Sequence, residues 1–195
     1  MQKIKLQLIF PTLLLCVLAA AAGCITGALT AGFGRVLLWI GTFRTEHLIS
    51  CVPFLPIAGV CMVWIYQKYG RESSQGMSLI FDAADGTAKR ISFRLIPLLI
   101  GSTWLTHLCG GSAGREGAAL QLGGSVGSVL GRVFRLAERD KQVLMLCGMS
   151  AAFSAIFRTP IAAPVFAMEV VCVGAMRYAA LVPCTIASLT ASWLA

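Results

Sequence analysis

Apolar stretches separated by short polar or glycine-rich segments run along the whole chain. Residues 6–43 and 51–69 are each long enough to cross the ~30 Å hydrocarbon core of a bilayer as an α-helix. The first stretch contains one charge, Arg35, and exceeds a simple span, so we expect a strongly tilted helix or a span with an interfacial extension. Pro53 and Pro56 fall in the first turns of the second stretch, where proline is best tolerated. The pattern predicts two membrane-spanning helices before residue 70.

The later apolar stretches are shorter and are interrupted by glycine or proline. They cover residues 76–84, 96–109, 143–157, 161–174 and 178–195, with a glycine-rich segment at 110–131 and a charged loop at 132–141. Because unpaired backbone groups are costly in lipid, broken helices occur there only where protein buries them or water reaches them. The alternation of full spans and broken segments predicts an all-α integral membrane protein. It favours a transporter over an anchor or a scaffold.

The composition supports a membrane location. Of the 195 residues 57% are hydrophobic and only 12% are charged, which is too few charges for a soluble domain of this length. The net charge of +8 includes basic residues beside the apolar stretches, as is typical of cytoplasmic loops: Lys3, Lys5, Lys68, Arg71, Lys89, Arg90 and Arg94. They do not form one face with interleaved aromatic residues, so nucleic-acid binding is not expected. The eight cysteines contain no CxxC pair, and we predict no metal site and no cofactor.

The first 24 residues allow two interpretations. A basic start, an apolar middle and the sequence Ala-Ala-Gly-Cys, which ends at Cys24, resemble a lipoprotein signal peptide. The apolar stretch nevertheless continues past Cys24 to residue 43. We therefore expect a retained first helix.

Two of the eight acidic residues, Glu116 and Glu169, lie outside polar turns. An ionisable group inside a membrane is costly and is a functional candidate for that reason. Glu116 lies between glycines, which favour a helix start and close approach of a ligand to the backbone. If a helix begins near Gly117, the helix dipole and unpaired amides would form an anion site without a fixed cation. These amides are those of Gly117, Ala118, Ala119 and Leu120.

A carboxylate at that point would compete with a permeating anion for the same amides. Protonation would release the carboxylate, which would couple anion occupancy to a proton. The sequence therefore predicts a gate or an antiporter site at Glu116. The alternative is an ion pair of Glu116 with Arg115 or Arg158 that holds two helices together.

Two segments resemble the signatures of the CLC family of chloride channels and anion/proton antiporters. The first comprises residues 110–117 (GGSAGREG) and 121–124 (QLGG), and the second comprises residues 148–153 (GMSAAF) and 159–169 (TPIAAPVFAME). Their order, their separation and the pattern of spans fit the first repeat of the family over nearly the whole chain. The resemblance implies a CLC-type half with tilted and broken, re-entrant helices in about 7–8 helical segments. Residues 1–195 would form one transmembrane domain, the N-terminal repeat, without a soluble domain.

The resemblance also implies roles for individual residues. Glu116 takes the position of the gating and proton-coupling glutamate. The implied anion-binding residues are Gly114, Arg115, Gly117, Ala118, Ala119, Leu120, Met77, Ser78 and Phe81. Met77 falls where most members carry an anion-binding serine, although a shift of one residue would place Ser78 there.

Two further departures concern the ion that is carried. Ala118 replaces a proline of the family, and Val170 stands where many antiporters carry an internal proton-transfer glutamate. Together with Met77, these departures are similar to the fluoride/proton-antiporting branch and favour fluoride over chloride. Met77 and Phe81 are candidate lining residues of such a site, with plain helix packing as the alternative.

The roles of two other ionisable groups, Glu169 and His107, are predicted less specifically. Glu169 would end a helix near the cytoplasmic face, where a bond to Arg177 or to a backbone group is favoured over a part in proton transfer. His107 is expected to be a hydrogen-bonded packing residue, with a proton relay as the alternative.

The predicted function is anion transport across the cell membrane by a multi-pass CLC-type channel or halide/proton antiporter. Its substrates would be chloride or fluoride and protons. CLC subunits contain two inverted repeats, and only one is present, so we expect a homodimer or a separate second-half CLC repeat as partner. The alternative is a truncated or partner-dependent half without transport activity of its own. An intramembrane enzyme is disfavoured, because no GxSxG, HExxH or paired-Asp motif occurs.

Overall fold

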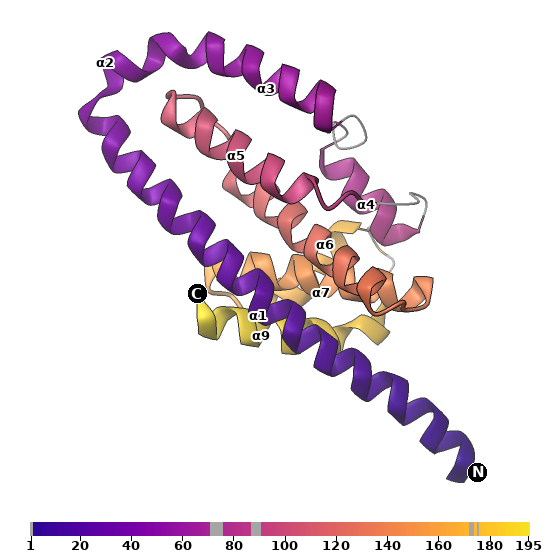
Figure 1. Ribbon diagram of the computed structural model, residues 1–195. Helices are drawn as coiled ribbons and strands as arrows, with labels where there is room; N and C mark the ends of the chain where they lie inside the picture. Colours follow the sequence, from indigo (N-terminus) through magenta and orange to yellow (C-terminus); the bar gives the residue numbers. More distant parts are fainter. Residues whose placement is uncertain (1, 71–75, 87–90, 172–173, 175) are drawn as a thin grey trace.

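The computed structural model describes the backbone of residues 2–70, 76–86, 91–171, 174 and 176–195, and side chains from residue 13 onward. Over these ranges the chain is helical, without a β-strand (Figure 1). The elements are α1 Gln2–Glu46, α2 Leu48–Cys51, η1 Val52–Phe54, α3 Leu55–Tyr69, α4 Met77–Asp85, α5 Leu95–Leu108, α6 Arg115–Val133, α7 Glu138–Phe157, α8 Ala162–Val171, η3 Tyr178–Ala180 and α9 Leu181–Leu194. The described residues form eight helical segments if α2, η1 and α3 count as one and η3 joins α9, which confirms the predicted fold class.

The two long N-terminal helices correspond to the two predicted spans. By length and composition, Leu13–Glu46 and Leu48–Tyr69 could each cross a membrane. α1 has 45 residues and is therefore about 68 Å long, more than twice the hydrocarbon thickness. It lies diagonally across the other helices, and α3 returns at an angle to it (Figure 1). Pro53 lies in the short 3₁₀ segment η1 between α2 and α3, which agrees with its place in the first turns of the second span.

Glycine allows α6 and α7 to pack with their backbones in contact at the centre of the molecule. A Cβ atom at Gly123 would lie 2.1 Å from the carbonyl oxygen of Gly148, and one at Gly148 would lie 2.0 Å from that of Gly123. One turn further on, a Cβ atom at Gly127 would lie 2.2 Å from the carbonyl oxygen of Leu144. Small residues permit such close approach between membrane helices. The glycines within α6 therefore serve packing and do not break the helix.

The contact between α1 and α9 follows the same rule. A Cβ atom at Gly23 would lie 2.5 Å from the carbonyl oxygen of Ala187, and one at Gly27 would lie 2.8 Å from the Cα atom of Ala191. Ala187 and Ala191 are fully buried. Small residues of both helices thus allow α1 and α9 to pack closely against each other.

The charged loop predicted at residues 132–141 is shorter than expected. α6 continues to Val133 and α7 begins at Glu138, so only residues 134–137 connect them. Arg132 lies in the last turn of α6, and Glu138 and Asp140 lie in the first turn of α7. These charges oppose the partial charges at the two helix ends and stabilise the longer helices. Of the predicted loop cations, Arg71, Lys89 and Arg90 lie outside the described residues, as do the side chains of Lys3 and Lys5.

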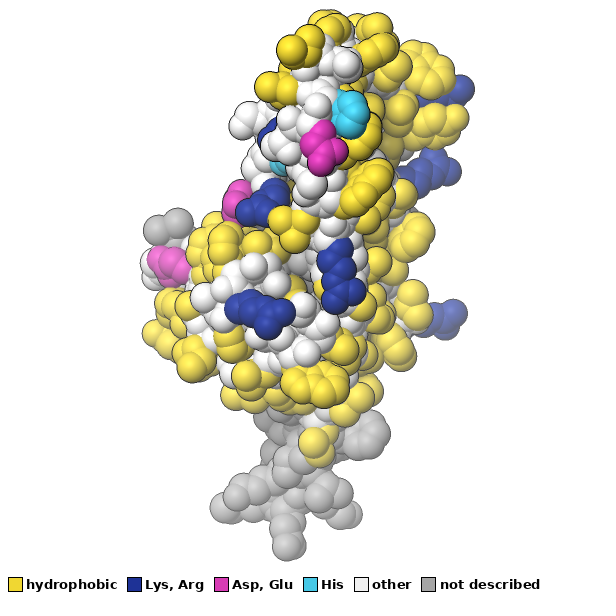
Figure 2. Space-filling view, turned by 90° about the vertical axis from the view of Figure 1, so that its left-hand side faces the viewer, with side chains coloured by type: hydrophobic (Ala, Val, Ile, Leu, Met, Phe, Trp, Pro, Cys, Tyr) yellow, Lys and Arg dark blue, Asp and Glu magenta, His cyan; other side chains and the backbone are white. Residues whose placement is uncertain are grey.

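Large apolar side chains remain exposed over much of the surface. Ile49, Ile161 and Trp193 are each more than 80% exposed. Figure 2 shows a face covered mainly by hydrophobic side chains, with separate charged groups among them. A surface of this kind is suited to lipid or to further protein.

The close contact of α6 and α7 predicts that Gly148→Ala destabilises the protein by about 1–3 kcal/mol, because the added methyl group would overlap backbone atoms of α6. The measurement is thermal unfolding of the purified chain in detergent, followed by circular dichroism. Gly101→Ala is the matched control, since Gly101 lies in α5 with no atom within 4 Å of its Cβ position. Equal melting temperatures for the two variants would contradict the proposed packing.

Candidate functional site

The chain is non-helical just before Glu116. α5 ends at Leu108, and α6 begins at Arg115 after an extended N-cap residue, Gly114, with φ −70° and ψ 126°. No side chain in the described part of the chain caps this helix end. The first four amides of a helix have no intrahelical partner, and here they belong to residues 114–117. The partial positive charge of the helix end is added to them, so this point attracts a negative group.

The observed start of α6 differs from the predicted one. A start near Gly117 was expected, and this is wrong by two residues. Because the helix begins earlier, Ala119 and Leu120 lie in its second turn with side chains that are 1% and 5% exposed. Ala118 lines a small apolar crevice with Phe33 and Leu99. The anion-binding roles of these residues stay predictions, whereas Gly114, Arg115 and Gly117 do lie at the unpaired amides.

The side chain of Glu116 lies at this helix start. Its Oε2 atom is 3.3 Å from the position that a Cβ atom would take at Gly114, so the carboxylate folds back over the N-cap. Glycine at this position leaves room for it. Among the described residues Glu116 forms no ion pair with Arg115 or Arg158, so the alternative of a structural ion pair is wrong. The carboxylate is exposed and has the helix end as its neighbour.

Met77 reaches the same point from another helix. α4 begins at Met77 after Gly76, whose φ of +65° favours glycine. The Cγ atom of Met77 is 3.9 Å from the Cβ position of Gly117, so the starts of α4 and α6 lie together. Met77 is therefore beside Gly117, at the start of α6, although it is 40 residues away in the sequence.

Packing between α4 and α6 explains why these helix starts meet. Ile80 is completely buried, and its Cγ2 atom lies 2.7 Å from the Cβ position of Gly124. Any larger residue at 124 would push α4 away. Phe81 is partly buried and packs against the core, and Ser78 is exposed. Phe81 therefore has the packing role that was its alternative reading, and a role for it in lining an anion site stays a prediction.

Glu169 and His107 have local hydrogen-bond partners. Glu169 Oε1 accepts a hydrogen bond from the backbone amide of Gly174 at 3.0 Å. This is the expected backbone partner, whereas Arg177 forms its ion pair with Asp85. His107 Nδ1 lies 2.8 Å from the carbonyl oxygen of Thr103, one turn earlier in α5. Both residues therefore have the hydrogen-bond partners expected of structural residues, and a part of either in proton transfer stays a prediction.

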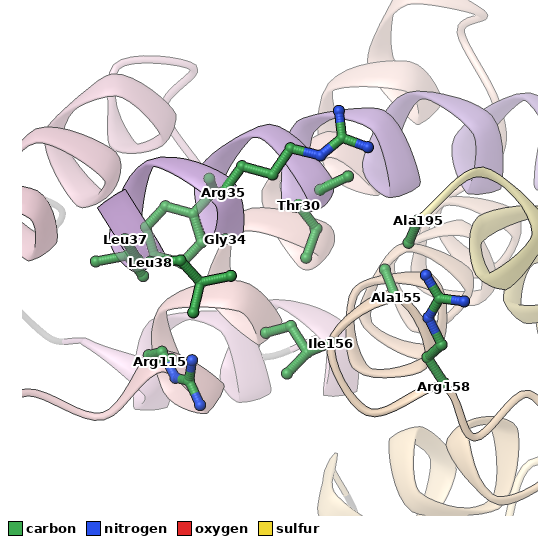
Figure 3. A pocket seen from close by; sticks show the side chains of 12 residues that line it. Thr30, Gly34, Arg35, Leu37, Leu38, Arg115, Ala155, Ile156, Arg158 and Ala195 are labelled. Carbon is green, nitrogen blue, oxygen red and sulfur yellow. The ribbon is translucent and has the colours of Figure 1, made fainter. Parts of the chain in front are cut away.

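A positively charged cavity lies next to the start of α6. It measures about 230 Å³ and lies between α1, the start of α6 and the end of α7 (Figure 3). Among the described residues its walls include three arginines, Arg35 of α1, Arg115 of α6 and Arg158 just after α7, and no acidic residue. Figure 3 shows Arg35 and Arg158 extending toward the end of the cavity at which Ala195 lies, whereas Arg115 lies beyond Ile156.

None of these three arginines forms an ion pair within the described ranges. A cavity lined by unpaired positive charges raises the local concentration of anions. Arg35 was not predicted to contribute to the site, although a single charge in a 38-residue apolar stretch was a signal for it. The grouping of Arg35 with Arg158 depends on how α1 crosses α7, which the sequence pattern does not contain.

Comparisons with known proteins show what the chain is similar to. The sequence profile of the family described as "Voltage gated chloride channel" matches residues 58–195. A "Chloride/fluoride channel protein" from Pseudomonas syringae pv. tomato is 39% identical over 176 residues, which cover 88% of this chain and 38% of the relative. A "Putative chloride channel protein ClcB-like" from Ralstonia nicotianae is 28% identical over 194 residues, which cover 89% of this chain and 44% of the relative.

Two solved structures share the fold. The crystal structure of a CLC-type fluoride/proton antiporter matches with a TM-score of 0.91 and 44% identity, over 95% of this chain and 47% of that one. A slow cyanobacterial Cl⁻/H⁺ antiporter matches with a TM-score of 0.78 and 20% identity, over 92% of this chain and 45% of that one. The chain thus spans less than half the length of these relatives. Since the family profile covers most of its residues, the chain belongs to the CLC family of voltage gated chloride channels and related membrane antiporters.

Proposed function

We propose that the chain provides half of the ion pathway of a CLC-type halide/proton antiporter, with Glu116 as its gating and proton-coupling carboxylate. The observation that carries the proposal is the position of Glu116, whose carboxylate folds over the N-cap of α6. An ionised carboxylate and a permeating anion would compete for the same amides and the same helix dipole. Protonation removes the negative charge, so the side chain leaves and an anion takes its place.

Fluoride is the proposed preferred anion. Relatives named as a chloride/fluoride channel protein and as a fluoride/proton antiporter are 39% and 44% identical to the chain. Met77 lies at the start of α6 and offers a thioether in place of the hydroxyl donor expected there. A site without that hydroxyl loses a hydrogen bond that would stabilise a bound chloride.

The remaining half of the pathway is proposed to come from a second repeat, as a separate chain or as a second copy in a homodimer in the cell membrane. The alternative function is a half-transporter that carries no ions by itself. The two are distinguished by reconstituting the chain in liposomes over a range of protein densities. Absence of flux at every density would establish the alternative for the chain on its own.

Glu116→Gln tests the gate directly. Glutamine has the shape of the protonated acid and carries no charge, so anion efflux from liposomes should continue but lose its dependence on pH. Proton movement coupled to anion efflux should disappear. The control is Glu138→Gln, because Glu138 is exposed and forms an ion pair with Lys141 in the next turn of α7. An unchanged pH dependence in Glu116→Gln would remove this residue from the mechanism.

Met77→Ser tests the choice of anion. A serine hydroxyl can donate a hydrogen bond to chloride, and a bond to a charged group contributes about 1.5–3 kcal/mol. The ratio of chloride to fluoride flux should therefore rise about tenfold or more. Ser78→Ala distinguishes the alternative alignment: if Ser78 is the anion-binding serine, chloride flux falls in Ser78→Ala while Met77→Ser leaves the ratio unchanged.

Arg35→Gln tests the positively charged cavity. If the three arginines concentrate anions by their field, the half-saturating anion concentration should rise about two- to fivefold at low ionic strength, with the maximal flux unchanged. The difference should vanish near 1 M of an impermeant salt, where the Debye length falls to about 3 Å. Arg132→Gln, an exposed arginine at the far end of α6, is the matched control. A difference that persists at high salt would contradict a field effect.

A further inference from the structure

The C-terminal end of α4 is held by one arginine from a distant part of the chain. Arg177 Nη1 donates hydrogen bonds to the carbonyl oxygen of Ala84 at 3.2 Å and to Gln142 Oε1 at 2.5 Å. Its Nη2 donates to the carboxylate of Asp85 at 2.9 Å and to the carbonyl oxygen of Asp85 at 3.4 Å. The two carbonyl groups are among the last of α4, which lack intrahelical partners. The guanidinium therefore joins α4, α7 and the segment before η3 at one point.

The surroundings of Arg177 suit this contact. A guanidinium carries a permanent charge and five donors in a rigid fork, and a cation is favoured at the C-terminal end of a helix. Gly86 follows α4 with φ +93°, and a Cβ atom there would lie 2.4 Å from Nε2 of Gln142. Glycine at this position thus lets Gln142 approach the helix end. The contact depends on arginine, glutamine and glycine together.

The opposite end of α4 carries Met77 at the start of α6. Eight residue steps separate Met77 from Asp85, or about 12 Å along the helix axis. Between them, the contact with α6 is apolar and centres on Ile80 against Gly124. Apolar packing is non-directional, so it fixes the distance between the helices better than the position of α4 along its own axis. The hydrogen bonds of Arg177 are directional and fix that position.

We propose that Arg177 is a positioning residue that sets anion selectivity by fixing the axial position of α4, and hence of Met77, at the start of α6. The inference rests on the proposed transport function. A displacement of α4 by 1 Å would change the spacing between Met77 and the unpaired amides by a similar amount. Misplacement on this scale is enough to alter the energetics of a preorganised site.

A double-mutant cycle in liposomes tests the inference. Arg177→Lys keeps the charge but loses the fork, and it should change the ratio of fluoride to chloride flux by about threefold or more. In a Met77→Ala background the same substitution should change the ratio by less than about twofold, because its effect passes through residue 77. A purely structural role would lower both fluxes together and leave their ratio unchanged.

The control is Arg139→Lys, the same substitution at an exposed arginine of α7. Hydrogen exchange of the purified chain gives a second measurement that needs no transport: protection of residues 77–85 should fall in Arg177→Lys, while that of α5 stays the same. If Arg177→Lys does not fold, Asp85→Asn replaces it, because it removes the charge from only one of the four acceptors.

The outcomes separate this inference from the function on which it rests. Wild-type flux that depends on Glu116, with an unchanged flux ratio in Arg177→Lys, would overturn the role of Arg177 and leave the function intact. An equal change of the ratio with and without Met77 would also overturn it, because the effect would then bypass residue 77. Wild-type protein that carries neither anion, both alone and together with a second-half repeat, would refute the proposed function, and the selectivity role would fall with it.

Discussion

Backbone amides without partners at the start of α6 are the constraint around which this molecule is arranged. In an apolar environment each such group is costly, so it must meet a negative or polar partner. Residues 110–114 interrupt the helical path, Gly114 leaves the helix end open, and the carboxylate of Glu116 folds over it. A partner that is covalently attached but titratable can be replaced by a mobile anion. The same interruption that threatens stability is therefore the proposed binding site.

The glycines of α6 hold this open end in place without closing it. Gly123 and Gly127 bring the middle of the helix into backbone contact with α7, and Gly124 admits Ile80 of α4. α6 is thus anchored along its length, while its first turn stays free to meet a ligand. The packing contacts in the middle of α6 stabilise the whole helix, so its first turn can remain without a side-chain cap. Rigidity and accessibility are supplied by different parts of one helix.

The sequence predicted the fold class, the two long spans and the break before Glu116, because the length of an apolar stretch and its glycine content are local signals. It placed the start of α6 two residues late, although an acidic residue in the first turn is itself a signal for a helix start. It could not separate glycines that break a helix from those that pack one, since both are small and flexible. The approach of Met77 to Gly117, and of Arg35 to Arg158, depends on long-range packing that no local pattern encodes.

Selectivity in such a site is a question of relative helix positions. The amides of α6 are backbone groups, so substitution cannot change their chemistry, and only their neighbours can distinguish one halide from another. Met77 is the neighbour at the start of α6, and it is carried by a nine-residue helix. Four of its nine residues are buried, so apolar packing fixes its distance from the neighbouring helices, and directional hydrogen bonds at its end fix its position along its own axis. The proposed roles of Arg177 at one end of α4 and of the anion site at the other are therefore linked through the rigid helix between them.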